Sequence, residues 1–254
     1  MKKKVVLLTN DDGINSPGLN SLYDAFSKKW ATYVVAPEWE RSASSHAVTL
    51  HRPLRVRKVK NMVYSVDGTP SDCVHLAVNG LLRKKPDIII SGINLGENLG
   101  DDITYSGTVS AAFEGTLLGI PSVAISIEGR RNFCFEPAVI VAERIVSIVL
   151  KNGLPPDTFL NVNVPNVSDI SKIKGIRITR KGRRVYREQV VKRKDPRGKW
   201  YYWIGGDNTN NQVPVKGSDI EAVREGYVSI TPINVDLTNY NVMDVLKKLF
   251  NDLW

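Results

Sequence analysis

Short apolar runs alternate with segments of helical periodicity along the first two thirds of the chain. β-Branched and aliphatic residues dominate the runs, which predict buried strands at residues 4–9, 33–36, 87–90, 122–127 and 159–164. Apolar residues at helical spacing predict helices between them, at residues 19–26, 73–82, 106–118 and 137–151. Because buried strands joined through helices form crossover units, the pattern predicts an α/β fold with a mostly parallel sheet and helices on both faces.

The second predicted helix begins with a strong capping signal. Thr69 is a favoured N-cap residue, Pro70 suits the first helical position, and Asp72 lies three residues after the cap, as in a capping box. We therefore expect the helix to open at these residues.

The alternation of strands and helices ends at about residue 165. Strand-like runs at residues 176–179, 186–191 and 200–204 follow one another without a helix, which predicts hairpins, and an amphipathic helix is predicted at residues 242–253. We expect a single α/β domain over residues 1–254, with its core at residues 1–165 and an extended hairpin arm at about residues 175–215. The aromatic cluster at residues 200–203 and the terminal amphipathic helix both need covering, which favours a homo-oligomer.

Basic residues outnumber acidic residues, 35 to 26, which gives a formal net charge of +9. Most of the surplus lies in residues 52–60 and 172–199. Three explanations stay open: two solvated basic hairpins, an anionic substrate, or a nucleic-acid partner.

The chain shows no signal for a membrane or for export. Its longest apolar runs are far shorter than the roughly 20 residues that span a bilayer, and the apolar run at residues 5–8 is too short for a removable signal peptide. Cys73 and Cys134 are far apart in the sequence, so they predict neither a disulfide framework nor a thiolate metal site. We therefore expect a cytoplasmic protein with no membrane partner.

Three loops that follow predicted strands are rich in oxygen ligands. Asp11 and Asp12 follow the first strand, Ser42 lies in the loop after the second, and Asn94 lies in the glycine-, amide- and carboxylate-rich loop after the third. The carboxyl ends of parallel strands share one edge of the sheet, so these loops should meet. With three histidines in the chain, zinc is disfavoured, whereas oxygen ligands suit Mg²⁺, Mn²⁺ or Ca²⁺. Alternatively, the aspartates belong to an ordinary turn that opens a helix.

Tyr105-Ser106-Gly107-Thr108-Val109 leads into a predicted helix. Free N–H groups at a helix start, together with hydroxyls, form an anion site that suits a phosphate, although a plain serine cap explains the same residues. The sequence contains no P-loop, dinucleotide fingerprint or nucleophile elbow, which disfavours nucleoside triphosphates, NAD and serine-hydrolase chemistry.

His46 lies close to Ser42 in the sequence and could act as a general acid, or it could be a loop histidine that only makes hydrogen bonds. His51 and His75 are interpreted as structural.

Several ordered motifs spread over nearly the whole chain match a known family. They include Thr9-Asn10-Asp11-Asp12-Gly13, Glu40-Arg41-Ser42, Gly68-Thr69-Pro70-Ser71-Asp72, Ser91-Gly92-Ile93-Asn94, Tyr105-Ser106-Gly107-Thr108, Asn161-Val162-Asn163-Val164-Pro165 and Glu225-Gly226-Tyr227-Val228-Ser229. On these residues the chain closely resembles the SurE (survival protein) family of nucleotidases. The resemblance implies a Rossmann-like core and a metal-dependent 5'/3'-nucleotidase that releases phosphate from nucleoside monophosphates. It also implies subunits that associate through the hairpin region, as a homodimer or homotetramer.

The resemblance also assigns site residues. The metal ligands correspond to Asp11, Asp12, Ser42 and Asn94, and the phosphate-binding residues to Asn98, Ser106, Gly107 and Thr108. We therefore expect one divalent cation per subunit, Mg²⁺ or Mn²⁺, for which Ca²⁺ could substitute in a crystal. Asp11, Asp12, Asn94 and His46 are the expected catalytic residues. Glu97 departs from the pattern, since many relatives have proline there, and this alters the charge and rigidity of its loop.

Two alternative functions are left open. The same site could serve a related phosphatase that acts on polyphosphate or sugar phosphates. In a different class, the basic arm and its aromatic residues could belong to a nucleic-acid-binding protein. A cleft lined by carboxylates repels a polyanion when no metal is bound, so no dedicated nucleic-acid partner is expected.

Overall fold

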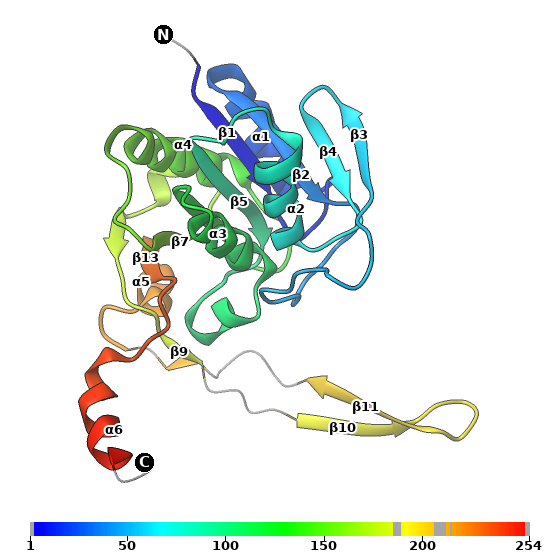
Figure 1. Cartoon of the computed structure of the whole chain (residues 1–254), viewed down its shortest axis with the longest axis vertical. Helices are drawn as coiled ribbons and strands as arrows, with labels where there is room; N and C mark the ends of the chain where they lie inside the picture. The colour runs from blue at the N-terminus through cyan, green and yellow to red at the C-terminus, as the bar shows by residue number, and fades with distance from the viewer. Residues whose placement is uncertain (1–2, 185–188, 206–211, 214, 252–254) are drawn as a thin grey trace.

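The computed structural model of the chain describes residues 3–184, 189–205, 212–213 and 215–251. Nine strands of this described part form one sheet in the order β3-β4-β2-β1-β5-β6-β7-β13-β8 (Figure 1). Their bounds are Val56–Lys60 (β3), Val63–Val66 (β4), Ala31–Pro37 (β2), Val5–Thr9 (β1), Ile88–Leu95 (β5), Ser122–Ile127 (β6), Thr158–Val164 (β7), Val228–Asn234 (β13) and Ile176–Ile178 (β8).

The sheet is mostly parallel, as the sequence predicted. The central strands from β4 to β7 pair in parallel, and so do β13 and β8, whereas β3 pairs with β4 and β13 with β7 in antiparallel fashion. The five predicted core strands are all present, within a few residues of the expected bounds except at the end of β5.

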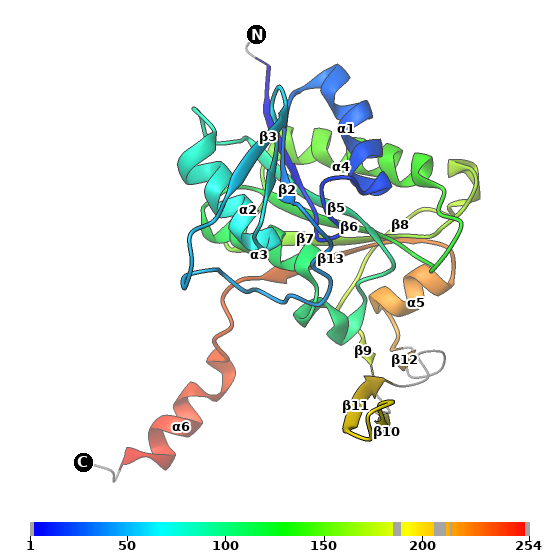
Figure 2. The ribbon, with the colours of Figure 1, turned by 90° about the vertical axis from the view of Figure 1, so that its right-hand side faces the viewer.

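Helices cover both faces of the sheet (Figure 2). Helices α1 (Pro17–Lys29) and α4 (Phe135–Asn152) lie on one face, and α2 (Pro70–Leu76) and α3 (Gly107–Leu117) lie on the other. Strand β1 shows how the core divides between the faces, because Leu8 packs in the cluster with α1 and α4 whereas Leu7 packs in the cluster with α2. The α/β prediction with helices on both faces is confirmed.

The predicted capping box at the start of α2 is present. The Thr69 side chain accepts a hydrogen bond from the Asp72 N–H, and the Asp72 carboxylate accepts one from the Thr69 N–H. The α-helix ends at Leu76 and continues as a π-helical turn at Ala77–Leu81, so the single helix predicted there has two parts.

Strand β5 is longer than predicted, and this changes the place of Asn94. The sequence predicted that the strand ends before Ser91-Gly92, but β5 continues to Leu95, with a register shift against β6 between Ser91 and Asn94. A Cβ atom on Gly92 would lie 2.2 Å from the Ile125 carbonyl oxygen, so this glycine serves close strand packing rather than a turn. Asn94 therefore projects from a strand of the sheet.

The C-terminal third supplies the sheet edge and an arm. Strand β8 lies at the edge of the main sheet, parallel to β13, rather than in a hairpin. The antiparallel hairpin of β10 (Gln189–Lys194) and β11 (Trp200–Gly205) projects from the body, next to the short pair β9 (Arg183–Arg184) and β12 (Gln212–Val213) (Figure 1). Part of the predicted strand at residues 186–191 lies outside the described residues.

Short helices complete the chain. Helix α5 (Asp219–Arg224) precedes β13, and 3₁₀ turns lie at Gly100–Thr104, Ile170–Lys172 and Tyr240–Val242. Helix α6 (Met243–Leu249) extends away from the body at the C-terminal end (Figure 2). No helix in the described part of the chain is both long enough and apolar enough to cross a membrane.

Candidate active site

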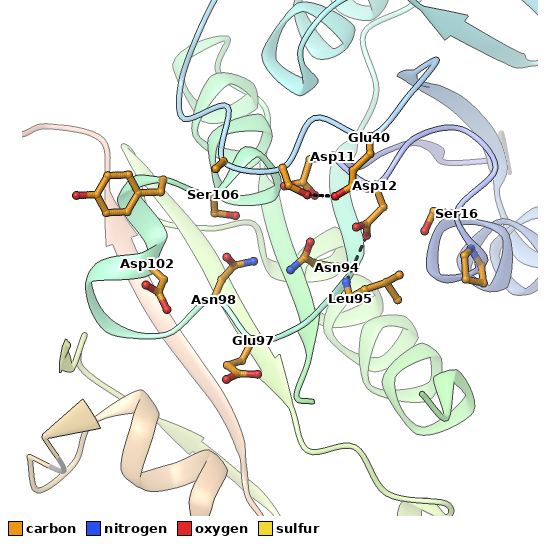
Figure 3. Close-up of a pocket in the computed structure, with 14 residues that line it drawn as sticks. Asp11, Asp12, Ser16, Glu40, Asn94, Leu95, Glu97, Asn98, Asp102 and Ser106 are labelled. Carbon is orange, nitrogen blue, oxygen red and sulfur yellow. Dashed lines mark hydrogen bonds between the residues drawn. The ribbon is translucent and has the colours of Figure 1, made fainter. Parts of the chain in front are cut away.

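A cavity of about 450 Å³ opens at the carboxyl edge of the sheet, where the ends of β1, β2 and β5 meet the start of α3. Six residues that the sequence assigned to metal or phosphate line this cavity: Asp11, Asp12, Ser42, Asn94, Asn98 and Ser106. Figure 3 labels five of them, all except Ser42, around a common space. Gly107, Thr108 and His46 are not among the lining residues.

Asp11 is buried and held by the first turn of α3. Its Oδ1 accepts a hydrogen bond from the Thr108 hydroxyl (2.5 Å) and its Oδ2 accepts one from the Thr108 N–H (3.1 Å). A Cβ atom on Gly107 would lie 2.8 Å from the Asp11 Cβ and 2.8 Å from the Ser44 hydroxyl oxygen, so the close approach requires glycine. The positive end of the α3 dipole thus faces the Asp11 carboxylate.

This arrangement changes the expected role of Gly107 and Thr108. The Thr108 N–H and hydroxyl bind Asp11, and the Ser106 hydroxyl oxygen accepts a hydrogen bond from the Val109 N–H, which makes Ser106 the N-cap. The phosphate-binding role predicted for Gly107 and Thr108 stays a prediction. Both residues contact Asp11, and neither lines the cavity.

Asp12 lies beside Asp11 at the cavity wall. Its Oδ2 accepts a hydrogen bond from the Leu95 N–H (3.3 Å; Figure 3). Burial raises the pKa of Asp12 to about 7, and the negative charges of Asp11 and Glu40 add to the effect, although the Leu95 hydrogen bond opposes it. Burial also raises the pKa of Asp11, against the hydrogen bonds from Thr108. The cavity therefore gathers negative charge that a cation would stabilise.

Asn94 completes the polar centre from β5. Its Nδ2 donates to the Gly96 carbonyl (2.7 Å), and its Oδ1 lies 3.3 Å from the Thr108 hydroxyl oxygen that also contacts Asp11. Thr108 therefore touches both a carboxylate and an amide of the site.

Ser42 reaches the cavity from the loop after β2. Its hydroxyl donates to a Glu40 carboxylate oxygen (2.7 Å), and the neighbouring Arg41 N–H donates to the Asp11 carbonyl (2.6 Å), which attaches this loop to the turn that follows β1. The Ser44 hydroxyl is buried and has no hydrogen-bond partner among the described residues. Glu40 belongs to one of the sequence motifs but had no predicted role, and only the fold brings it to the same cavity as the aspartates.

Glu97 also lines the cavity, and its carboxylate accepts a hydrogen bond from the Gly129 N–H (3.2 Å). The loop that carries Glu97 is therefore tied to the loop after β6. Asp102 and Tyr105 line the cavity on the α3 side, and neither was among the predicted site residues.

His46 lies outside the cavity in a cluster of its own. Its Nε2 is 2.8 Å from one Glu114 carboxylate oxygen, and the His75 Nδ1 is 3.2 Å from the other. The His46 ring also packs on Phe113, with 4.9 Å between ring centroids. Sequence reasoning missed Glu114, because it lies within a helix pattern with no local sign of a polar partner. The general-acid role of His46 stays a prediction.

The donors around the cavity suit a hard cation. No cluster of three or more His, Cys, Asp or Glu side chains that could hold a metal occurs in the part of the chain that the structure describes. The Asn94 amide oxygen and the Ser42 hydroxyl line the same cavity as Asp11 and Asp12, and both could serve as further ligands beside water. An all-oxygen set that includes two carboxylates fits Mg²⁺, Mn²⁺ or Ca²⁺.

Comparisons with known proteins identify the family. The family described as "Survival protein SurE" matches residues 6–188. The chain is 50% identical over 244 residues to "5'-nucleotidase SurE" of Geotalea daltonii, covering 96% of this chain and 98% of that protein. It is 51% identical over 245 residues to the protein of the same name from Aquifex aeolicus, covering 96% and 97%. The crystal structure of the SurE protein from Aquifex aeolicus superposes with a TM-score of 0.86 at 50% identity, covering 96% of this chain and 99% of that one. The chain therefore belongs to the SurE family.

Proposed function

We propose that this protein is a divalent-metal-dependent phosphomonoesterase that releases phosphate from nucleoside monophosphates. The observation that supports the proposal best is the adjacent pair Asp11 and Asp12 in one cavity with Asn94 and Ser42. Relatives about half identical over nearly the full chain are named 5'-nucleotidases, which agrees with this chemistry.

In the proposed reaction, Asp11, Asp12, Asn94 and Ser42 would hold the cation. When bound, a divalent cation polarises a phosphoryl oxygen and lowers the pKa of water. The protein's own residues then orient the reactants. Thr108 fixes the orientation of the Asp11 carboxylate through two hydrogen bonds.

Asn98 and Ser106 are the residues best placed to contact phosphate oxygens. Both line the cavity, and neither has used all of its donors: the Asn98 amide gives one hydrogen bond to Ser126, and the Ser106 hydroxyl accepts from the helix and can still donate. Donors fixed in this way stabilise the charge that develops on phosphate during attack by water. The site requires no covalent intermediate.

The cavity wall favours a nucleotide over polyphosphate. Its volume of about 450 Å³ lies within the range of small-molecule sites, and the partly exposed aromatic ring of Tyr105 forms part of the lining. A ring in this position offers a base a stacking surface, which polyphosphate would not use.

We further propose that the protein is a cytoplasmic homodimer or homotetramer. Several large apolar side chains on the arm and on α6 are exposed, including Trp200, Trp203, Leu246 and Leu249. A second copy would cover them.

The same surface is the reason to keep the nucleic-acid alternative. The Lys192 ammonium lies 4.3 Å from the centroid of the Trp200 ring, so a cation and an aromatic ring lie together where a base and its phosphate could bind.

Phosphate release from a panel of substrates tests the proposal. Nucleoside 5'- and 3'-monophosphates, a sugar phosphate and polyphosphate are compared at equal concentration, after chelation and after return of Mg²⁺, Mn²⁺ or Ca²⁺. We expect fastest release from a nucleoside monophosphate, loss of activity in chelator and recovery with Mn²⁺ or Mg²⁺. Full turnover with no metal detectable by elemental analysis would refute the metal role. Tight single-strand binding without any phosphate release would favour the nucleic-acid alternative.

A further inference from the structure

The loop that joins β5 to α3 places Asn98 in the cavity wall, yet no regular strand or helix holds it there. Asn98 itself is buried. Its backbone N–H and carbonyl must therefore find partners within the protein, because an unpaired buried backbone group is costly.

Asn163 on β7 supplies both partners. Its Oδ1 accepts a hydrogen bond from the Asn98 N–H (2.8 Å), and its Nδ2 donates one to the Asn98 carbonyl (3.0 Å). One side-chain amide thus binds the backbone of Asn98 on both sides, as a neighbouring strand would. Among the standard uncharged side chains of this length, only asparagine offers one acceptor and one donor in this geometry.

The Asn98 side chain is held separately. Its Nδ2 donates to the Ser126 hydroxyl oxygen on β6 (2.8 Å), and Ser126 lies directly beside Asn163 in the sheet register. Two adjacent strand residues therefore set the position of one cavity residue. The Asn163 side chain holds the backbone of Asn98, and the Ser126 hydroxyl holds the side chain of Asn98. Figure 3 shows the resulting Asn98 amide beside Asn94 and Ser106.

The fold alone does not account for these polar residues. Asn161, Asn163 and Ser126 are fully buried on the central strands, whereas Val162 and Val164, which alternate with the asparagines along β7, pack in the apolar core. An aliphatic side chain at these positions would pack in the sheet equally well. Buried polar groups, in contrast, cost stability unless they are hydrogen bonded. The Asn161 Nδ2 also donates to the Asn98 carbonyl (2.9 Å), but its Oδ1 has no partner among the described residues.

We infer that Asn163 and Ser126 are positioning residues that orient Asn98 toward the phosphate of the substrate. The inference rests on the proposed function and adds to it two residues that do not line the cavity. Asn161 is a weaker contributor, since the Asn98 carbonyl keeps its bond from Asn163 when Asn161 is removed.

Four variants test the inference: Asn163→Ala, Ser126→Ala, Asn161→Ala and the control Ser229→Ala. Ser229 lies on β13, opposite Asn163 in the register, and its buried hydroxyl pairs with Thr179 (2.8 Å) rather than with Asn98. The control therefore removes one buried hydrogen bond from the neighbouring strand without touching Asn98.

The measurements are KM and kcat for the best nucleoside monophosphate, the inhibition constant of inorganic phosphate, and Mn²⁺ affinity. We expect Asn163→Ala and Ser126→Ala to raise KM and the phosphate inhibition constant by roughly 10-fold or more, with a smaller change in kcat and unchanged Mn²⁺ affinity. Asn161→Ala should change them by less than about 3-fold, and Ser229→Ala should leave them unchanged even if its melting temperature falls.

A double-mutant cycle checks that the effect passes through Asn98. In an Asn98→Ala background, Asn163→Ala should add little to the rise in KM, because the side chain that it positions is already gone. The inference is overturned if Asn163→Ala leaves KM and the phosphate inhibition constant within about twofold of the parent. If Asn163→Ala does not fold, the same criterion applies to Ser126→Ala. The inference is also overturned if Ser229→Ala reproduces the effect. An inactive parent protein would instead refute the proposed function.

Discussion

The Thr108 side chain and backbone both donate to the carboxylate of Asp11, although the two residues are 97 positions apart in the sequence. The contact joins the end of β1 to the first turn of α3. It determines the direction of a carboxylate that the proposed function makes a metal ligand, so Thr108 should influence metal binding without being a ligand itself.

Thr108→Val should therefore lower Mn²⁺ affinity. The variant keeps the backbone N–H and loses the hydroxyl, and removal of a residue that supports a metal ligand typically costs about 10- to 100-fold in affinity or activity. Thr108→Ser should restore most of the loss. Metal titration and kcat measure the effect, and Thr116→Val is the matched control because its hydroxyl bonds to the Ala112 carbonyl on the same helix, away from the site. Unchanged Mn²⁺ affinity in Thr108→Val would contradict the role.

The four predicted metal ligands should differ in their effects. Asp11→Asn, Asp12→Asn and Asn94→Ala should each lower kcat by at least about 100-fold with the fold intact, as expected when a catalytic cation or its orientation is lost. Ser42→Ala should cost about 10- to 100-fold and recover in part at high metal concentration, because water can replace a neutral hydroxyl. Steady-state kinetics and circular dichroism test this, with the exposed Asp24→Asn as control. Near-normal kcat for both folded aspartate variants would mean that residues 10–13 form only a turn.

His46→Ala should reduce kcat by less than about 10-fold and keep the acidic limb of the pH–rate profile. The reason is its position: the imidazole is bound to Glu114 and packs on Phe113 rather than lining the cavity. A loss of about 100-fold together with a flattened acidic limb would establish His46 as the general acid after all.

Glu114 should make stability depend on pH in acid. Hydrogen bonds from His46, and secondarily from His75, lower the pKa of Glu114 below its ordinary value of 4.5, although burial opposes them. A carboxyl whose pKa is lowered by folding stabilises the protein fully above its unfolded-state pKa, and this contribution is lost as the pH falls through the folded-state pKa.

The free energy of unfolding of wild-type protein should therefore exceed that of Glu114→Gln at pH 6 to 7, and the difference should shrink as the pH falls below about 4.5. Chemical denaturation across this range measures it. The exposed Glu136→Gln serves as control. A difference that grows toward acid would show that the hydrogen bonds do not favour the ionised carboxyl.

The oligomer should depend on the exposed apolar residues of α6. Light scattering at micromolar concentration should give a dimer or tetramer, and the double substitution Leu246→Glu and Leu249→Glu should lower the mass, because buried charges without partners oppose association. Lys247→Glu, on the same helix but outside the apolar set, should have a smaller effect. A fully active wild-type monomer would refute the proposed assembly.

Local sequence patterns predicted much of the fold and several of the residues that line the cavity. Strand and helix periodicity predicted the parallel core, and the capping signal at Thr69 and Asp72 predicted the start of α2. These features depend on residues a few positions apart. The rule that loops after parallel strands share one edge was enough to bring Asp11 and Ser42 to one cavity, whereas Asn94 reaches it from the last residues of β5.

The end of β5 shows where such patterns mislead. Ser91-Gly92 has the composition of a turn, but the strand continues because Gly92 allows close packing on Ile125. That choice depends on a neighbouring strand that is distant in sequence, so local composition cannot predict it.

The sequence by itself determined the fold class, the oxygen-rich chemistry of the site and the helix starts, because each follows from short-range periodicity and residue type. Only the tertiary structure decided which polar group binds which: Thr108 with Asp11, Asn163 with Asn98, and His46 with Glu114 rather than with the cavity. A buried donor or acceptor needs a partner in space, and here each partner lies 65 to 97 positions away. The packing of strands and helices selects that partner, and a linear pattern does not contain it.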